Sequence, residues 1–296
     1  MRIVVLQCGA DAPPFSSLLA RAGITAAPPH QHYEVSLVPT RKELSVIDPV
    51  AAELLPVDPE PTPEEIAQQK SVPHLGQPQP APQRPSEPLR VIVVGTDAAL
   101  AAVATYLMRK NLLWVELAHI PTAASTAAKN WQIRSGRGLD AAGALSGATM
   151  PVPLIRDDTG HAIVGYALLT EPGISGLSSA TGFFGEVYVD EHKMFTGTCP
   201  GLQIRPTPTA PGIVAAELPA PESSAAASTS APPSLWQKLR GRRARSSVRP
   251  PHQPMTGRAV QVGSTGFRFV RDGIESKKPR EKTTLYRHLR DLQIVH

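Results

Sequence analysis

The sequence predicts an α/β N-terminal half, Rossmann-like with three layers, followed by a β-sandwich-like C-terminal half, with long disordered linkers. Two stretches predict the α/β half, because residues 90–100 (RVIVVGTDAAL) and 115–131 (VELAHIPTAASTAAKNW) each read as a buried strand, a tight turn and the start of a helix. From residue 152 onward, short apolar runs are bounded by Gly, Pro and Asp, which is typical of strands joined by hairpins. A chain of 296 residues is long enough for two modest cores.

The first predicted unit covers residues 1–48 and has a β-α-β order. Residues 1–7 (MRIVVLQ) predict a buried strand, residues 15–22 predict a short helix that ends before Gly23, and residues 33–38 predict a second strand. A helix between two strands is the usual connection of a parallel pair, so the N-terminal sheet is expected to begin here.

The second predicted unit, residues 49–88, is a proline-rich linker. Proline recurs every few residues among Glu, Gln and Ala, as in PVDPEPTPEE and GQPQPAPQRP. A segment of this composition cannot bury enough apolar surface to order itself, so we expect it to stay extended. Within it, only residues 63–70 are compatible with one or two helical turns.

The third predicted unit, residues 89–150, is an α/β region with nucleotide-binding character. The strand that ends at Gly95 leads through a turn into an alanine-rich helix. A helix N-terminus presents unpaired backbone N–H groups and the positive end of the helix dipole, which together suit a phosphate. The same residues also fit an ordinary strand-to-helix turn in which Asp97 caps the helix.

These two stretches resemble the nucleotide-binding half of the diacylglycerol kinase and lipid kinase family, which is related in fold to the NAD kinases. That family carries Gly-Gly-Asp-Gly-Thr after one strand and Pro-x-Gly-Thr-Gly-Asn after the next. Residues 95–99 fall on the first motif and residues 121–127 on the second; Gly95, Asp97 and Pro121 match, whereas the other glycines are replaced. Each residue that replaces a glycine adds a Cβ, which leaves less room for a phosphate group beside the backbone.

The resemblance implies ATP- and Mg²⁺-dependent phosphorylation of a lipid hydroxyl. It implies a catalytic Asp97 in the phosphate–metal region and a set of ATP contacts from both motifs: Gly95, Thr96, Asp97, Ala98, Ser125 and Thr126. For Ser125 and Thr126, a polar helix face is the competing interpretation. The missing glycines lead to an alternative function, a catalytically inactive kinase-fold protein that acts as a binding or scaffold module at a membrane surface or with a protein partner.

The last predicted unit, residues 151–296, is a β domain with a disordered basic insertion at about residues 219–256. In the resembled family, the β domain ends around an Asp-Gly-Glu whose glutamate is a catalytic candidate. Here Asp272-Gly273 is expected to form a hairpin turn. Ile274 occupies the position of the glutamate and Glu275 follows it, so the resemblance implies Glu275 as the candidate base. A shift of one residue along a strand turns a side chain to the opposite face, which makes Glu275 a displaced substitute.

The basic insertion predicts contact with an anionic surface. Five of its cations lie close together: Lys238, Arg240, Arg242, Arg243 and Arg245. Because Leu235, Trp236 and Leu239 accompany these cations, an anionic membrane surface or lipid is the preferred partner. Nucleic acid is less favoured, since Trp236 is the sole aromatic residue among them. A solubilising charged loop is the third interpretation.

Charge and cysteine content restrict the remaining classes. The net charge is +5 and the pI is about 9.4, and the two cysteines, Cys8 and Cys199, show no CxxC spacing. This pattern predicts neither a metal cluster nor a disulfide framework. The first residues lack a signal-peptide core, and no apolar run approaches the roughly 20 residues needed to span a bilayer. We therefore expect a cytoplasmic protein with peripheral attachment to membranes.

Overall fold

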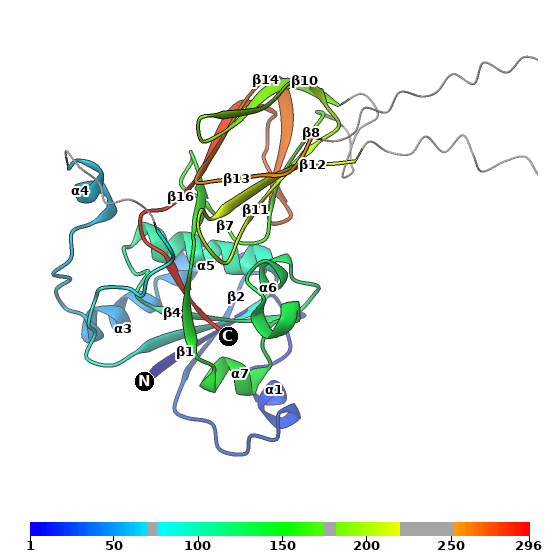
Figure 1. The fold of residues 1–296 in the computed structure, drawn as a ribbon. Helices are drawn as coiled ribbons and strands as arrows, with labels where there is room; N and C mark the ends of the chain where they lie inside the picture. The colour runs from blue at the N-terminus through cyan, green and yellow to red at the C-terminus, as the bar shows by residue number, and fades with distance from the viewer. Residues whose placement is uncertain (70–75, 174–181, 220–251) are drawn as a thin grey trace, which may run out of the picture.

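The computed structural model describes residues 1–69, 76–173, 182–219 and 252–296, and it contains two β-sheets. One sheet is six-stranded and mostly parallel, with helices on both faces. The other is an antiparallel array of eleven strands (Figure 1). The predicted succession of an α/β half and a β half is confirmed.

The first sheet is built from strands that are distant in sequence. Its strands, in spatial order, are β2 (Gln31–Val35), β1 (Arg2–Cys8), β3 (Leu89–Gly95), β4 (Glu116–Pro121), β17 (Leu292–Val295) and β5 (Thr149–Val152). All neighbours are parallel except β5, which runs antiparallel to β17. Strand β3 is buried at every residue, because helices cover both faces of the sheet, and a continuous apolar run is the sequence signature of such a strand.

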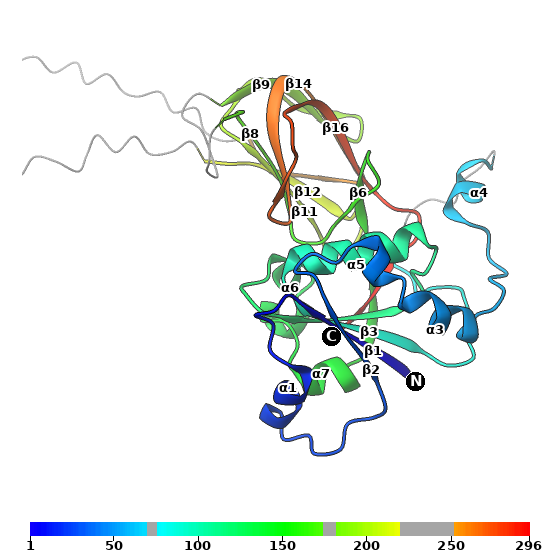
Figure 2. The ribbon, with the colours of Figure 1, turned by 180° about the vertical axis from the view of Figure 1, so that it is seen from behind.

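Helices form the outer layers of this half. They are α1 (Phe15–Arg21), α2 (Arg41–Leu44), α3 (Ile47–Leu54), α4 (Pro63–Ala67), α5 (Asp97–Arg109), α6 (Thr126–Asn130), η1 (Ile133–Gly136) and α7 (Ala141–Ser146). Helix α5 lies on the side of the sheet that faces the β half, whereas α1 and α7 lie on the opposite side (Figures 1 and 2). Helix α5 therefore sits between the two halves of the molecule.

One long, bent strand organises the β half. The strands of this half are β6 (Ile155–Asp157), β7 (Ala162–Ile163), β8 (Ala167–Thr170), β9 (Phe183–Val189), β10 (His192–Cys199), β11 (Leu202–Pro206), β12 (Ile213–Glu217), β13 (Met255–Gly257), β14 (Ala259–Arg271), β15 (Ile274–Glu275) and β16 (Arg280–Arg287). The first part of β14 pairs with β9 and β16, and its last four residues pair with β8. The pairing with β16 shifts register between Gly263 and Phe267, so β14 passes from one layer of the sandwich to the other.

Residues 49–88 differ from the expected linker. Helix α3 begins at Ile47 and buries Val50, Ala51 and Leu54, so the first part of this segment belongs to the core. The described part between residue 76 and β3 has no helix or strand, but it is held in place: Gln79 N donates to Asp291 Oδ2 at 2.9 Å. Composition did not indicate this order, because it comes from packing against the distant C-terminal residues. The short helix expected within residues 63–70 is present as α4.

The C-terminal boundary also differs from the expectation that the β domain extends to residue 296. Strand β17 leaves the β half and inserts into the first sheet between β4 and β5. All four of its residues are buried. The connection from β16 to β17, residues 288–291, therefore joins the two halves a second time.

The predicted basic insertion lies mainly outside the described residues. Lys238, Arg240, Arg242, Arg243 and Arg245 all fall within residues 220–251, and their contact with an anionic membrane stays a prediction. Within the described ranges, no helix combines the length and the apolar character needed to cross a membrane.

Candidate functional site

Gly95 and Thr96 form the turn between β3 and α5, and local packing explains both. A Cβ on Gly95 would lie 2.8 Å from Cys8 Cβ and 3.1 Å from Ala99 Cβ, so the close approach of β1 and α5 requires a glycine here. The Thr96 side chain caps α5 by accepting a hydrogen bond from Ala99 N at 3.4 Å. The cap residue is therefore Thr96 rather than Asp97.

Asp97 connects the two strand-to-helix turns. Its Oδ1 accepts a hydrogen bond from Ser125 Oγ at 2.6 Å, and its Oδ2 accepts from Thr126 N at 2.7 Å and Ala127 N at 3.1 Å. The carboxylate thus occupies the first turn of α6, where the resemblance placed a phosphate. The structure brings Asp97, Ser125 and Thr126 together, and it does so through contacts within the protein.

Asp272 is a second carboxylate at the junction, and the sequence indicated only a hairpin turn for it. It follows β14 with a φ of 47° and is buried. It accepts hydrogen bonds from Val164 N at 3.1 Å, Gly165 N at 2.7 Å and Tyr166 N at 2.9 Å. Burial, together with the nearby Asp97 carboxylate, raises the pKa of Asp272 to about 7, although the three N–H donors favour its charged form.

Gly165 lies between these two carboxylates. A Cβ at this position would be 2.9 Å from Asp272 Oδ1 and 2.9 Å from Asp97 Oδ2. Asn130 of α6 donates a hydrogen bond to the Gly165 carbonyl at 2.6 Å. Residues from α5, α6 and the hairpin of the β half therefore hold one short backbone segment, which fixes the two halves against each other.

A cavity of about 510 Å³ runs along α5 beside this junction. Its lining comes from both halves of the protein: Val38, Pro39, Arg41, Leu44, Ala98, Ala101, Ala102, Thr105, Tyr106, Arg109, Lys110, His161, Ala162, Arg271, Asp272 and Ile274. Small side chains at the start of α5 make one end of the wall apolar, and cations at the end of the helix make the other end basic. We call this space the α5 cavity.

Two of its cations lack a carboxylate partner among the described residues. Arg271 pairs with Asp157 at 2.6 Å, and Lys110 pairs with Asp48 at 2.8 Å. By contrast, Arg109 donates to the carbonyls of Gly160 and Thr159, at 3.0 and 3.3 Å, and its Nη2 lies 3.5 Å from His161 Nε2. No ion pair of Arg41 or Arg109 is found in the described ranges. The α5 cavity therefore carries uncompensated positive charge.

His161 stands on the basic side of the α5 cavity. Burial lowers its pKa, and the neighbouring Arg271 and Arg109 lower it further, against the opposing effect of Asp157. The imidazole is thus held in its neutral form to lower pH than usual. At neutral pH the positive charge of the cavity comes from the arginines and Lys110.

The predicted site residues fall into separate groups. Of the expected ATP contacts, Ala98 lines the α5 cavity, whereas Gly95, Thr96 and Asp97 belong to the turns described above. Glu275, the candidate base, lies on β15 with a side chain 52% exposed and pairs with Arg268 at 2.7 Å. Its neighbour Ile274 is the residue that lines the cavity. The sequence did not single out the cavity-lining cations. Arg41 and Arg109 lie on the same helices, α2 and α5, as apolar residues of the wall, whereas Arg271 lies on β14.

Comparison with known proteins identifies the fold. No protein-family model matches the chain, and no curated protein matches it by sequence. A solved diacylglycerol kinase structure from Bacillus anthracis matches with a TM-score of 0.56 and 8% identity, covering 100% of this chain and 96% of the other. Two further structures from that organism, whose diacylglycerol kinase assignment is provisional, match with 9% identity and cover 100% of this chain. One has a TM-score of 0.57 and is itself covered to 96%, and the other has a TM-score of 0.58 and is covered to 97%. The chain thus has a diacylglycerol kinase-like fold, as the two motifs predicted.

Proposed function

We propose that this chain, which has the diacylglycerol kinase-like fold, binds a phosphate-bearing ligand of nucleotide size in the α5 cavity without transferring its phosphate. The observation that carries the proposal is the pair of uncompensated guanidinium groups, Arg41 and Arg109, on the wall of a cavity of about 510 Å³. This volume lies within the range of roughly 300–1,000 Å³ that small-molecule sites occupy. ATP is the reference ligand, because the fold is that of ATP-dependent enzymes in the resembled family.

The lining supports a ligand with one apolar and one anionic end. The guanidinium group offers a fixed fork of N–H donors that matches phosphate oxygens. Arg109 now donates to two neutral carbonyls, and a phosphate would add a charge-assisted hydrogen bond that these cannot supply. Ala98, Ala101 and Ala102 leave a flat apolar surface at the other end of the wall, which suits a nucleobase.

The residues do not fit a bound Mg²⁺. In phosphoryl-transfer sites the metal is held by one or two carboxylates together with the substrate phosphates. Here the two carboxylates at the junction, Asp97 and Asp272, each accept three hydrogen bonds from the protein. No group of three His, Cys, Asp or Glu residues suited to a metal occurs in the described ranges. These contacts favour the inactive alternative over a phosphotransferase.

Matched variants test the binding part of the proposal. ATP, AMP, adenosine and inorganic triphosphate would be titrated into the full chain by calorimetry, with and without Mg²⁺. We expect ATP to bind without Mg²⁺, and Arg109→Gln and Arg41→Gln each to weaken binding about tenfold, or about 1.4 kcal/mol. Lys42→Gln is the control, because Lys42 is an exposed cation beside Arg41 that does not line the cavity. Equal weakening by the control, or no binding at all, would contradict the proposal.

A separate assay tests the absence of transfer. The purified chain would be incubated with labelled ATP, Mg²⁺ and either diacylglycerol or a sphingoid lipid, and the lipid fraction counted. We expect no labelled lipid. Transfer that depends on Asp97 would restore the kinase interpretation while leaving the location of the ligand untouched.

A further inference from the structure

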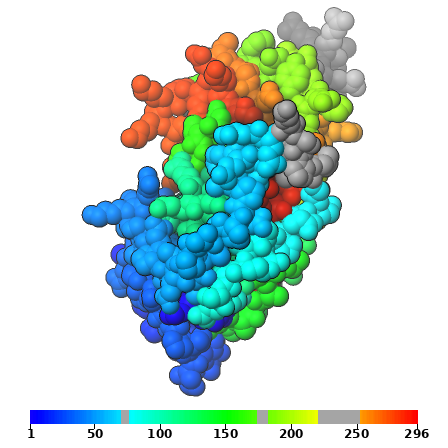
Figure 3. Space-filling view, turned by 90° about the vertical axis from the view of Figure 1, so that its left-hand side faces the viewer, coloured from blue at the N-terminus to red at the C-terminus, as the bar shows by residue number. Residues whose placement is uncertain are grey.

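A second cavity lies between the proline-rich segment and the connection from β16 to β17. It has a volume of about 260 Å³ and is lined by Glu60, Ile66, Gly76, Gln77, Gln79, Pro80, Ala81, Pro82, Gln83, Leu113, Arg287, Leu289, Arg290 and Asp291. In the space-filling view, the red atoms near the C-terminus lie recessed between the light-blue α4 segment and the cyan proline-rich segment (Figure 3). We call this space the hinge cavity, because residues 288–291 join the two halves.

Several residues that line the hinge cavity carry buried polar atoms without a hydrogen-bond partner. Four buried side-chain atoms on its lining residues have no hydrogen-bond partner in the part of the chain that the structure describes: Gln83 Oε1, Arg287 Nε, Arg290 Nε and Arg290 Nη1. Gln83 and Arg287 are only 5% and 4% exposed. Because an unpaired buried polar group destabilises the folded protein, four such atoms on the residues lining one cavity point to a ligand as the missing partner.

The two arginines differ in charge balance. Arg287 is neutralised, since its Nη2 donates to Asp291 Oδ1 at 2.9 Å and its Nη1 donates to the Gly76 carbonyl at 2.7 Å. Arg290 donates only to the Pro61 carbonyl, and no carboxylate of the described residues pairs with it. Its guanidinium can therefore turn toward the cavity at the cost of one hydrogen bond to a neutral group.

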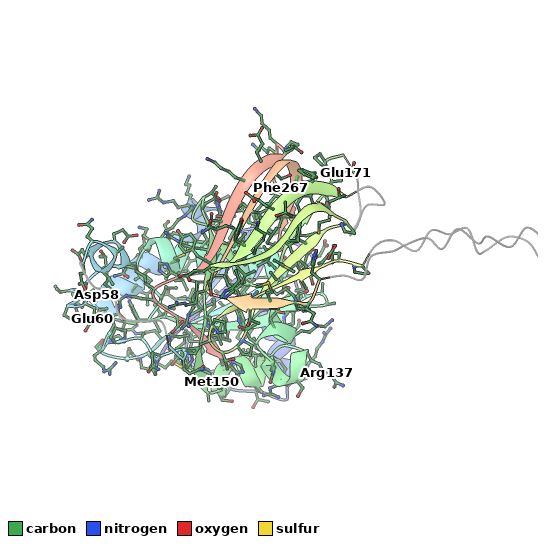
Figure 4. The ribbon with its side chains drawn as sticks, turned by 45° about the horizontal axis from the view of Figure 1, so that its top comes forward. Asp58, Glu60, Arg137, Met150, Glu171 and Phe267 are labelled. Atoms are coloured by element: carbon green, nitrogen blue, oxygen red, sulfur yellow. The ribbon has the colours of Figure 1, made fainter. Side chains whose placement is uncertain are left out.

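The cavity also contains a carboxylate. Glu60 lines it, and its side-chain oxygens accept no hydrogen bond from the described residues. Asp58 and Glu60 lie close together at the outer edge of the α/β half (Figure 4). Asp58 is occupied, because its Oδ2 accepts from Gln83 Nε2 at 3.0 Å and from Asn111 Nδ2 at 3.2 Å. Glu60 thus remains as the acceptor of a positive charge.

We infer that the hinge cavity binds a free α-amino acid. The ligand's carboxylate would pair with Arg290 and accept from Arg287 Nε, and its ammonium group would donate to Glu60 and Gln83 Oε1. A zwitterion satisfies unpaired donors and unpaired acceptors together, whereas a simple anion leaves Glu60 and Gln83 unmatched. The volume lies just below the range of drug-sized sites, which excludes a nucleotide and suits a ligand of this size.

Such a ligand would act on the connection between the halves. Besides the Gln79–Asp291 hydrogen bond, Gln77 Oε1 accepts from Ala210 N of the β half at 3.3 Å. An amino acid held between the proline-rich segment and Arg290 would strengthen these contacts, since a ligand bound only by the folded state stabilises it. This inference does not depend on the ligand proposed for the α5 cavity.

The test is calorimetry and thermal shift on the full chain with the twenty amino acids, acetate, methylamine and inorganic phosphate. We expect at least one amino acid to bind with a Kd below about 1 mM. Acetate and methylamine are expected to bind at least tenfold more weakly than that amino acid. Arg290→Gln and Glu60→Gln should each weaken the binding of that amino acid at least tenfold. Arg84→Gln should not, because Arg84 is an exposed cation on the proline-rich segment that does not line the cavity.

Several outcomes would overturn the inference. Acetate or phosphate binding as tightly as any amino acid would reduce the site to a simple anion site, and absence of binding would mean that the cavity holds water. If Arg290→Gln does not fold, Arg290→Lys can be used instead, because it keeps the positive charge and removes the forked guanidinium group. This variant should still bind the amino acid more weakly than the wild type. Unchanged affinity in a folded Glu60→Gln would exclude an ammonium group from the ligand.

Discussion

Asp97 of the α/β half and Asp272 of the β half lie on either side of Gly165, and each carboxylate binds backbone N–H groups of a different segment. Asp97 holds the first turn of α6, and Asp272 holds residues 164–166. Two carboxylates placed this close together are used here for structure. The junction of the two halves therefore depends on hydrogen bonds to these two carboxyl groups.

Gly165→Ala is expected to destabilise the protein. The added Cβ would come within 2.9 Å of an oxygen of each carboxylate, so the backbone segment or both carboxylates must shift. Forcing atoms into a packed site typically costs about 1–3 kcal/mol. Urea unfolding measures the loss, with Gly76→Ala as the control, because a Cβ at Gly76 meets no atom within 4 Å. Equal stability of the two variants would show that the junction is looser than the structure indicates.

Asp97→Ala is expected to lower the free energy of unfolding by about 2–4 kcal/mol. The substitution removes one carboxylate that accepts two backbone N–H groups and the Ser125 hydroxyl, and hydrogen bonds to charged groups are worth about 1.5–3 kcal/mol. A carboxylate reserved for a metal or phosphate would behave differently, since its removal commonly stabilises the ligand-free protein. Chemical denaturation of the two proteins without ligand distinguishes these roles.

The α/β half could be predicted from sequence because its central strands are buried on both faces. Strand β3 is entirely apolar apart from Arg90 and Gly95, and the turn and helix that follow it are local features. Strand β17 is different: its apolar residues indicate a strand, but nothing local indicates that it pairs with β4. Pairing between residues 177 positions apart, such as Glu116 and Gln293, is set by the whole fold.

The site was predictable only in part, for the same reason. Asp97 could be singled out from the sequence because it lies in a motif. Its hydrogen-bond partners, however, belong to the next motif, and these bonds give the carboxylate a structural role in place of a ligand contact. Asp272 read as a hairpin turn, since the N–H groups that it accepts from lie more than 100 residues earlier. Arg41 and Arg109 come from two different helices, and only the folded chain places them around one cavity.

Glu275→Gln is expected to have little effect on the stability of the protein or on its affinity for ATP. The side chain is half exposed and pairs with Arg268, and an exposed ion pair contributes about 0–1 kcal/mol. Because Ile274, and not Glu275, lines the α5 cavity, we expect the affinity for ATP to change less than twofold. Calorimetry on Glu275→Gln beside Arg109→Gln provides the comparison. A loss of binding as large as that of Arg109→Gln would place Glu275 in the site.

Asp272→Asn is expected to change how stability depends on pH. The pKa of Asp272 is about 7 in the folded protein and about 3.9 in an unfolded chain, so between these values the folded state binds more protons. Stability must then fall as pH rises from 4 to 7, by on the order of 4 kcal/mol at about 1.4 kcal/mol per pKa unit. Asparagine removes this dependence, and it tolerates the positive φ of 47°.

Subtracting the unfolding free energy of Asp272→Asn from that of the wild type separates the contribution of Asp272 from that of the histidines. Burial lowers the pKa of His288 to about 4, and a depressed histidine pKa makes the folded state less stable as pH falls below about 6.5, which is the opposite slope. Both proteins share this contribution, so it cancels when the unfolding free energy of Asp272→Asn is subtracted from that of the wild type at each pH. We expect the difference to favour the wild type at pH 4 and to decrease steadily toward pH 7. A difference independent of pH would mean that the three N–H donors keep Asp272 charged throughout.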